Sequence, residues 1–323
     1  MIIYEFICLV IFFGGKDLEL QNTNEKILYT MYLTHFLEKA VASCYAEGLI
    51  PGTFHLCLGE EASHLAVAFA KQEGDKVLNT HRSHGEALAL GISPRELMAE
   101  FMGRESSLSR GRGGSMHLAC PEKDYIGSNG IVGGNFSVGC GVALALKKSK
   151  SQRVCFVVTG EGALSEGSFH ESINMACLWK LPIVFICTDN GYGVSTKREK
   201  ALAGRLDDRI KSYGARLFEA DGNDPLASIE AIKNARAEAV GFCPAFVRLK
   251  TYRVCGHSKS DKNLYRDESE IASWERLSPI SRFESYLKNN NMPLARIDEL
   301  RQGAIDEIKE ATEKAKGYPY PSF

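Results

Sequence analysis

Two short loops of this chain combine acidic and amide oxygens with glycine. Residues 160–162 (GEG) follow the apolar segment 154–159, and residues 189–192 (DNGY) follow a second apolar segment, 183–188. The two segments are typical of buried strands in a parallel sheet, joined by a helix over about 164–178. A right-handed crossover puts both loops at one sheet edge, where Glu161 and Asn190 can meet. Such oxygens beside a helix N-terminus suit a hard cation that bridges to phosphate, although the glycines could also serve only to turn the chain.

Two further polar clusters could take part in chemistry. Residues 81–85 (HRSHG) hold an arginine, which binds phosphate through two hydrogen bonds, and histidines that can relay a proton near pH 7. Residues 251–258 (TYRVCGHS) follow an expected strand over 245–249 and also carry a histidine. Taken alone, such clusters are more often a surface turn or an ordinary loop histidine. The sequence contains no hydrolase nucleophile elbow, Walker loop or zinc-type cysteine spacing.

The elements that must position these clusters follow from apolar periodicity and from helix start and stop signals. We expect helices over residues 24–47, 59–71, 94–102 (after a Ser93 cap), 225–240 and 279–316, the last broken near residues 289–291. Ten glycines between residues 103 and 141 predict a loop region where backbone approaches another group closely. The pattern predicts one doubly wound α/β domain, residues 24–323, with C-terminal helices from about 279 and an N-terminal extension over residues 1–23.

Charge and composition exclude several classes of protein. The chain has 323 residues, with 39 Lys and Arg against 40 Asp and Glu and a formal net charge of -1. This balance speaks against intrinsic disorder and against non-specific nucleic-acid binding. The ten cysteines include no C-x-x-C pair and predict buried thiols in a reducing compartment. Residues 1–15 are apolar but carry no Lys or Arg, which argues against a signal or transit peptide, and are too few to span a bilayer. We expect a cytoplasmic protein with no membrane or nucleic-acid partner.

Taken in order, the motifs resemble the alpha subunit of the thiamine-diphosphate-dependent decarboxylase component of 2-oxoacid and acetoin dehydrogenase complexes. The resemblance runs from about Glu25 to the C-terminal residues 318–321 (YPYP). It implies the thiamine-diphosphate-binding fold, a doubly wound, mostly parallel sheet with helices on both faces. The motifs that carry it are FHL at 54–56, GEEA at 59–62, HRSHG at 81–85, GRGGSMH at 111–117, NGIVGGN at 129–135, GEG at 160–162, DNGY at 189–192, TYR at 251–253 and GHS at 256–258.

The resemblance implies a role for each matching residue. The magnesium ligands it implies are Glu161, Asn190 and the carbonyl of Tyr192. The residues that it implies for thiamine diphosphate are His81, Arg82, Gly130, Val132, Gly162 and Ala163. The histidines that match those lining the active site are His55, His84 and His257. His81 stands where many members have tyrosine.

Three positions depart from the family pattern. The usual GDG is GEG here, the usual Asn-Asn pair is Asp189 and Asn190, and Cys255 stands where many pyruvate-type members have histidine. Magnesium requires near-octahedral geometry at about 2.1 Å, so the extra methylene of Glu161 matters. A catalytically weakened cofactor-binding or scaffold paralogue therefore stays open as an alternative.

The function implied is cleavage of pyruvate or acetoin, with transfer of the acyl group to a lipoyl-bearing acyltransferase. In this family the cofactor lies between two chains and a beta-subunit glutamate activates its aminopyrimidine, so we expect an alpha2-beta2 assembly. A lyase or synthase that uses thiamine diphosphate without a lipoyl domain is a further alternative. Residues 80–82 and Cys255 look acetoin-like, whereas residues 256–261 (GHSKSD) look pyruvate-like. Ser258 matches a position phosphorylated in mitochondrial relatives, but we expect an ordinary polar loop residue there.

Overall fold

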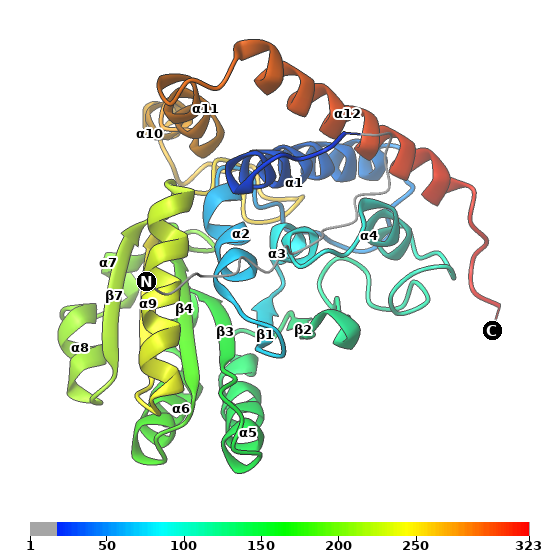
Figure 1. Ribbon diagram of the computed structural model, residues 1–323. Helices are drawn as coiled ribbons and strands as arrows, with labels where there is room; N and C mark the ends of the chain where they lie inside the picture. The colour runs from blue at the N-terminus through cyan, green and yellow to red at the C-terminus, as the bar shows by residue number, and fades with distance from the viewer. Residues whose placement is uncertain (1–17, 323) are drawn as a thin grey trace.

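The computed structural model describes residues 18–322 and has at its centre a parallel six-stranded sheet with helices on both faces (Figure 1). The strand order is β2-β1-β3-β4-β8-β7. The strands are β1 (Lys76–Thr80), β2 (Tyr125–Asn129), β3 (Cys155–Gly160), β4 (Ile183–Asp189), β7 (Arg216–Asp221) and β8 (Ala245–Lys250). A separate hairpin consists of β5 (Tyr192–Gly193) and β6 (Thr196–Lys197). The doubly wound α/β fold is thus confirmed. The expected N-terminal extension, residues 1–23, lies mostly outside the described residues.

The central strands are buried on both faces, and alternate side chains enter two separate hydrophobic layers. One row across β1, β3, β4 and β8 consists of Leu78, Val157, Phe185 and Phe246, and the adjacent row consists of Val77, Phe156, Val184 and Ala245. The first row packs beneath α5 (Gly134–Lys148), α6 (Gly167–Leu178) and α8 (Leu206–Ser212). The second packs against the layer that contains α2 (Glu61–Ala70) and α9 (Pro225–Val240). Successive side chains of a strand point to opposite faces, and both faces of this sheet are buried. This explains why β3 and β4 consist of nearly continuous apolar residues.

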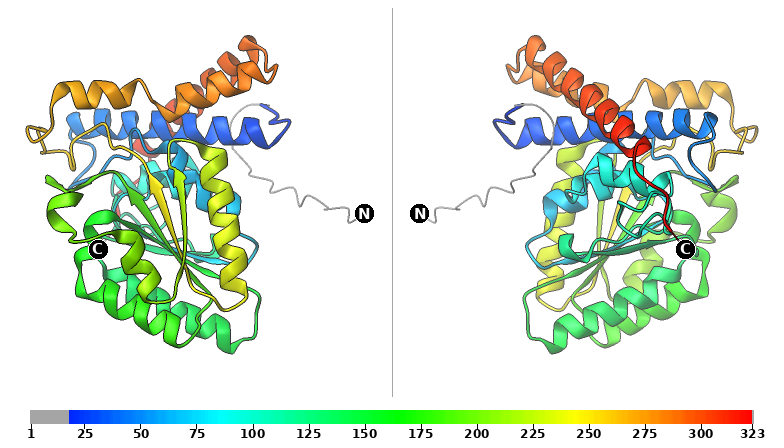
Figure 2. Two further views of the ribbon diagram at one scale, coloured as in Figure 1. Left: turned by 90° about the vertical axis from the view of Figure 1, so that its left-hand side faces the viewer. Right: turned by 90° about the vertical axis from the view of Figure 1, so that its right-hand side faces the viewer.

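The two ends of the described chain pack together beyond the sheet. Helix α1 (Thr23–Ala46) lies against α12 (Leu294–Lys316), as Figure 2 shows in blue and red. The Tyr29 hydroxyl donates to Glu307 at 2.7 Å, and Arg296 forms an ion pair with Glu25 at 2.7 Å. Among residues 18–322, no helix has the length and apolar content needed to cross a membrane.

Most predicted helices begin and end within two residues of the observed ones. Besides α1, α2, α9 and α12, these are α4 (Pro94–Phe101), which begins at a Ser93–Glu96 capping box, and α11 (Pro279–Asn289). The predicted helix over 164–178 is shorter, because residues 161–165 form the 3-10 turn η2 and α6 begins only at Gly167. The other α-helices were not predicted, namely α3 (His84–Ala89), α5, α7 (Arg198–Ala201), α8 and α10 (Glu268–Glu275).

The glycine-rich region contains more regular structure than its composition predicts. The expectation of a loop over 103–141 is wrong in part, since β2 and most of the first half of α5 lie there. The loop that remains is ordered by the buried carboxylate of Glu100, which accepts the N–H groups of Ser109 at 2.8 Å and Gly113 at 2.7 Å. A Cβ on Gly113 would lie 2.3 Å from the carbonyl oxygen of His117, so only glycine fits there. One carboxylate with several charge-assisted hydrogen bonds thus sets the shape of the loop.

The close approach of α5 to β3 gives a test of the fold. A Cβ on buried Gly139 would lie 2.2 Å from Cγ2 of Val157, whereas exposed Gly141, two residues along the same helix, has no atom within 4 Å of its Cβ position. We expect Gly139→Ala to lower the free energy of unfolding by about 1–3 kcal/mol through overpacking. Gly141→Ala is the control and should be neutral or stabilising by about 0.5–1 kcal/mol. Urea denaturation measures both, and equal stabilities of the two variants would refute the contact.

Candidate active site

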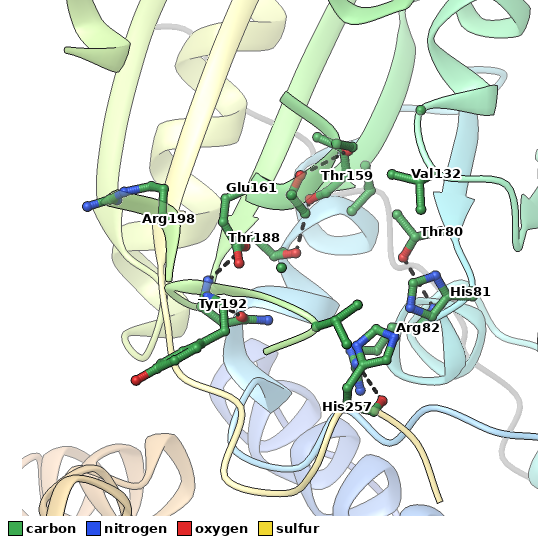
Figure 3. A pocket seen from close by; sticks show the side chains of 18 of the residues that line it. Thr80, His81, Arg82, Val132, Thr159, Glu161, Thr188, Tyr192, Arg198 and His257 are labelled. Carbon is green, nitrogen blue, oxygen red and sulfur yellow. Dashed lines mark hydrogen bonds between the residues drawn. The ribbon is translucent and has the colours of Figure 1, made fainter. Parts of the chain in front are cut away.

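The polar loops of the sequence lie at the carboxyl ends of three adjacent strands. β1 ends at Thr80, β3 at Gly160 and β4 at Asp189. From β1 the chain crosses to β2 on one side, and from β2 it returns past β1 to β3 on the other, so the winding reverses between β1 and β3. Ligands of doubly wound folds bind at such a switch point. A cavity of about 340 Å³ lies there, lined by residues 80–82 and 160–163 among others (Figure 3).

Glu161 is the buried acid of this cavity. Its side chain is 3% exposed, and its Oε2 accepts the backbone N–H of Asn190 at 3.3 Å, so the two predicted loops do meet. Its Oε1 is buried and has no hydrogen-bond partner among the described residues. Burial, reinforced by the nearby Asp189 carboxylate, raises the pKa of Glu161 to about 7. A bound cation is the partner that such an oxygen lacks.

Glu60 links the acidic and basic ends of the site. It immediately precedes α2 and is fully buried; its Oε1 accepts the side-chain N–H of Asn190 at 3.2 Å. Its Oε2 lies 3.8 Å from Nε of Arg82 and has no hydrogen-bond partner. Glu60 is not among the site residues predicted from the sequence. The only signal was its place in the GEEA motif, where an acidic residue beside a helix N-terminus is usual.

The departure at Asp189 has a structural explanation. Its carboxylate accepts hydrogen bonds from the Arg198 guanidinium and, at 2.7 Å, from Nε of Arg248. Burial raises the pKa of Asp189, while Arg198 opposes that rise. Two arginines thus accommodate an acid where the family usually has an amide.

The predicted tyrosine approaches the acidic end only through its backbone. The Tyr192 N–H donates to the side-chain oxygen of Asn190 at 3.2 Å. The Tyr192 hydroxyl donates to Glu270 at 2.8 Å, and the ring points away from Glu161 in Figure 3. The Tyr192 phenol is therefore directed away from Glu161, and only its backbone contacts Asn190.

The other end of the cavity is basic, whereas bare glycine backbone follows Glu161 at the acidic end. Arg82 is buried and donates to the carbonyl oxygens of Leu56 and, at 3.1 Å, of His257. A Cβ on Gly162 would lie 3.1 Å from Cα of Gly193, so the η2 and β5 backbones approach closely. Glycine here leaves peptide groups accessible, as phosphate binding requires.

The structure brings most of the predicted site residues to one cavity. The predicted residues that line it are His81, Arg82, Val132, Glu161, Gly162, Ala163, Asn190, Tyr192 and His257. Gly130 and His55 do not line it, although His55 packs against both cavity histidines. His84 neither lines the cavity nor packs against the other predicted histidines, because it begins α3 and is fully buried. Its Nδ1 lies 3.0 Å from Oε1 of Glu38 and its Nε2 lies 2.7 Å from Oγ of Ser115.

The residues present fit a diphosphate held through a hard cation. At the acidic end, the buried Oε1 of Glu161 has no hydrogen-bond partner, and oxygen ligands are those that Mg²⁺ prefers. Arg82 and the peptide groups near Gly162 supply the donors that phosphate oxygens need. The arrangement can therefore bind and orient a phosphorylated cofactor, but it contains no nucleophile and base pair of the hydrolase type among the described cavity residues.

Comparisons with known proteins find relatives over most of the chain. The model of the Dehydrogenase E1 component family matches residues 29–323. The chain is 35% identical over 308 residues to the alpha subunit of acetoin:2,6-dichlorophenolindophenol oxidoreductase from Bacillus subtilis, covering 94% of this chain and 92% of that protein. It is 34% identical over 312 residues to the pyruvate dehydrogenase E1 component subunit alpha of Rickettsia bellii, covering 95% of each. A mitochondrial E1 alpha subunit from Dictyostelium discoideum is 34% identical, over 95% of this chain and 82% of the relative.

The unpartnered acid gives a pH-dependent test. The pKa of Glu161 is raised from 4.5 to about 7 in the folded chain, so the folded state binds this proton more tightly than the unfolded state. The resulting stability is therefore present below pH 4.5 and is lost as the pH rises through 7. Glu161→Gln cannot ionise, and we expect it to stabilise the metal-free chain by up to about 3 kcal/mol at pH 8 and by little at pH 4.

Guanidinium denaturation in the presence of a chelator measures this difference. Glu166→Gln, which removes an exposed carboxylate five residues along the chain, is the control and should not change the pH dependence. An unchanged pH dependence in Glu161→Gln would contradict the description of Glu161 as a buried acid without a cationic partner.

Proposed function

The chain belongs to the dehydrogenase E1 component family, and from this membership we propose that it is the alpha subunit of an enzyme that cleaves pyruvate or acetoin. The acyl group passes to a lipoyl-bearing acyltransferase. The observation that carries the proposal is the meeting of Glu161, Asn190 and Arg82 at the switch point of the sheet. The cofactor that the family implies is thiamine diphosphate.

The cofactor's diphosphate and its magnesium ion have separate sets of candidate ligands. Arg82 and the backbone of Gly162 and Ala163 bind the diphosphate. Glu161, the side-chain oxygen of Asn190 and the carbonyl of Tyr192 bind Mg²⁺, which is supported by the unpartnered Oε1 of Glu161. When bound, thiamine diphosphate supplies the carbon nucleophile and electron sink that this chain lacks.

The chain's own residues orient the cofactor and present neutral histidines to the substrate. Burial, reinforced by the Arg82 guanidinium, lowers the pKa of His81 to about 3 and that of His257 to about 4. At pH 7 these imidazoles are neutral, so each can accept a hydrogen bond or a proton but provides no fixed positive charge. The backbone of Gly130 and Val132 contacts the aminopyrimidine. His84 is a positioning residue that acts through Ser115.

The site is proposed to be completed by a second chain. Apolar side chains at the cavity are exposed, with Ile131 at 72%, Val132 at 54% and Val194 at 53%. A partner that covers them removes apolar surface from water and closes the cavity to solvent. Because the relatives are named as alpha subunits, this partner is a beta subunit. The alpha2-beta2 stoichiometry is proposed from the family resemblance alone.

An active subunit is favoured over a catalytically weakened paralogue. Arg198 and Arg248 neutralise the negative charge that Asp189 introduces. The hydrogen bond between the Asn190 N–H and Glu161 is still formed. The longer Glu161 arm reaches Asn190 while keeping one oxygen unpartnered. Both departures are thus compatible with a bound metal.

Metal-dependent cofactor binding tests the ligand assignment. In a reconstituted alpha-beta pair we expect Glu161→Ala to weaken Mg²⁺-dependent binding of thiamine diphosphate by at least about a hundredfold, roughly 2.7 kcal/mol. Glu161→Asp should retain it, because Asp keeps the carboxylate. Calorimetry measures both variants, and the chain without its partner should bind weakly and show no turnover. Wild-type affinity in Glu161→Ala would exclude Glu161 as a ligand and favour the scaffold alternative.

The neutral histidines also predict a substrate preference. A 2-oxoacid brings a carboxylate that benefits from a cation, but Lys259 contacts the Tyr45 hydroxyl and ring and does not line the cavity. The guanidinium groups of Arg82 and Arg253 do line it, but both already donate to backbone carbonyl oxygens. Acetoin is uncharged and can donate its hydroxyl to a neutral imidazole. We therefore expect kcat/KM for acetoin to exceed that for pyruvate by about tenfold, or 1.4 kcal/mol, in the reconstituted pair with an artificial electron acceptor. A hundredfold preference for pyruvate would rule this out.

A further inference from the structure

Three histidines from separate segments form one cluster beside the cavity. His55 precedes α2, His81 follows β1 and His257 lies in the loop after β8. The ring centroid of His55 lies 4.3 Å from that of His81 and 4.9 Å from that of His257. The ring centroids of His81 and His257 are 5.5 Å apart. One ligating nitrogen from each ring lies within 4.8 Å of the other two. Among residues 18–322 this is the one group of three or more potential metal ligands with that spacing.

One ring of the cluster lacks the hydrogen bond that its burial requires. His55 is only 7% exposed, and its Nδ1 is buried with no hydrogen-bond partner. A buried polar atom left without a partner costs about 1–3 kcal/mol. The cluster therefore contains an unsatisfied nitrogen that a ligand between the rings would satisfy.

All three rings are neutral at pH 7, which is the form that binds metal ions. Burial lowers the pKa of His55 to about 2, and His81 and His257 are shifted in the same direction. The cationic groups nearby are Arg82 and Arg253, and they oppose a bound cation as well as protonation. Glu60, 3.8 Å from Arg82, and Asp261, which accepts the His257 backbone N–H at 2.6 Å, offset part of that charge.

We propose that His55, His81 and His257 form a binding site for a transition-metal ion of the Zn²⁺ class. Three imidazoles suit Zn²⁺, Co²⁺, Ni²⁺ or Cu²⁺ and not the hard ions Mg²⁺ and Ca²⁺, which take oxygen ligands. A tetrahedral ion with Zn–N bonds of about 2.0–2.1 Å holds its nitrogens about 3.4 Å apart, so the rings must close inward by small rotations. The fourth position is open, as in zinc sites with three protein ligands.

The site is distinct from the magnesium site proposed at Glu161. Its ligands are nitrogens from three loops, whereas the Glu161 site offers oxygens after β3 and β4. In Figure 3, His81 and His257 lie with Arg82 at one end of the cavity and Glu161 lies at the other. Because His81 and His257 line the cavity, an ion held by them narrows it at that end. Metal binding here does not depend on the cofactor or on turnover.

The test is titration of the full-length chain, without cofactor, with Zn²⁺ in a large excess of Mg²⁺ that occupies the oxygen site. Calorimetry should detect one Zn²⁺ per chain, and Co²⁺ should acquire the visible absorption of a tetrahedral, nitrogen-rich site. We expect His81→Phe and His257→Phe each to weaken Zn²⁺ binding by at least about tenfold and to remove the Co²⁺ absorption. His170→Gln is the matched control, because His170 lies on α6 outside the cluster and contacts Tyr213 at 2.8 Å.

Circular dichroism and thermal unfolding of each variant separate loss of the site from loss of the fold. The two Phe variants alter different loops, so at least one folded variant is needed for the comparison. Absence of Zn²⁺ binding to the wild type, wild-type affinity in a folded Phe variant, or an equal loss in His170→Gln would each overturn the proposal. Loss of Zn²⁺ binding in a folded Phe variant, with wild-type Zn²⁺ affinity in His170→Gln, would support the proposed site.

Discussion

The carboxyl edge of β3 and β4 holds three buried carboxylates, and the balance of their negative charge is the constraint on which the site depends. Asp189 is paired with Arg198 and Arg248. Glu60 accepts from Asn190 and lies 3.8 Å from Arg82. Glu161 has no cationic partner, and burial beside Asp189 raises its pKa. A buried charge without a partner raises the free energy of the folded state by several kcal/mol, so a cation bound at this edge would stabilise it.

The amino edge of the same sheet is organised differently. Asp75, just before β1, is fully buried and accepts from Nε of Arg236 on α9 at 2.6 Å and from the backbone N–H of Val154 at 2.8 Å. Both of its oxygens are therefore satisfied within the chain. Asp75 at the amino edge is thus fully paired, whereas Glu60 and Glu161 at the carboxyl edge each keep one oxygen without a hydrogen-bond partner. This contrast locates the ligand end of the sheet without reference to any relative.

Arg82 connects the separate parts of the site. Its guanidinium donates to the carbonyl oxygens of Leu56 and His257, which ties the FHL and GHS segments to the end of β1. Its charge helps to keep the neighbouring histidines neutral. A single buried cation therefore positions the loops, offers donors to phosphate and sets the protonation state at the substrate end.

The sequence alone determined the fold class, the bounds of α9 and the meeting of Glu161 with Asn190. These follow from local periodicity, from capping residues and from the fixed hand of parallel crossovers. It did not reveal β1 and β2, because Asn79, Thr80 and residues 127–129 have the composition of turns. Only the tertiary structure decided the side-chain partners: Arg248 for Asp189, Asn190 for Glu60, and Glu38 for His84, which separates His84 from the other three histidines. Those partners lie 46 to 130 residues apart in the chain, and packing of whole elements, which no local pattern encodes, brings them within hydrogen-bond distance.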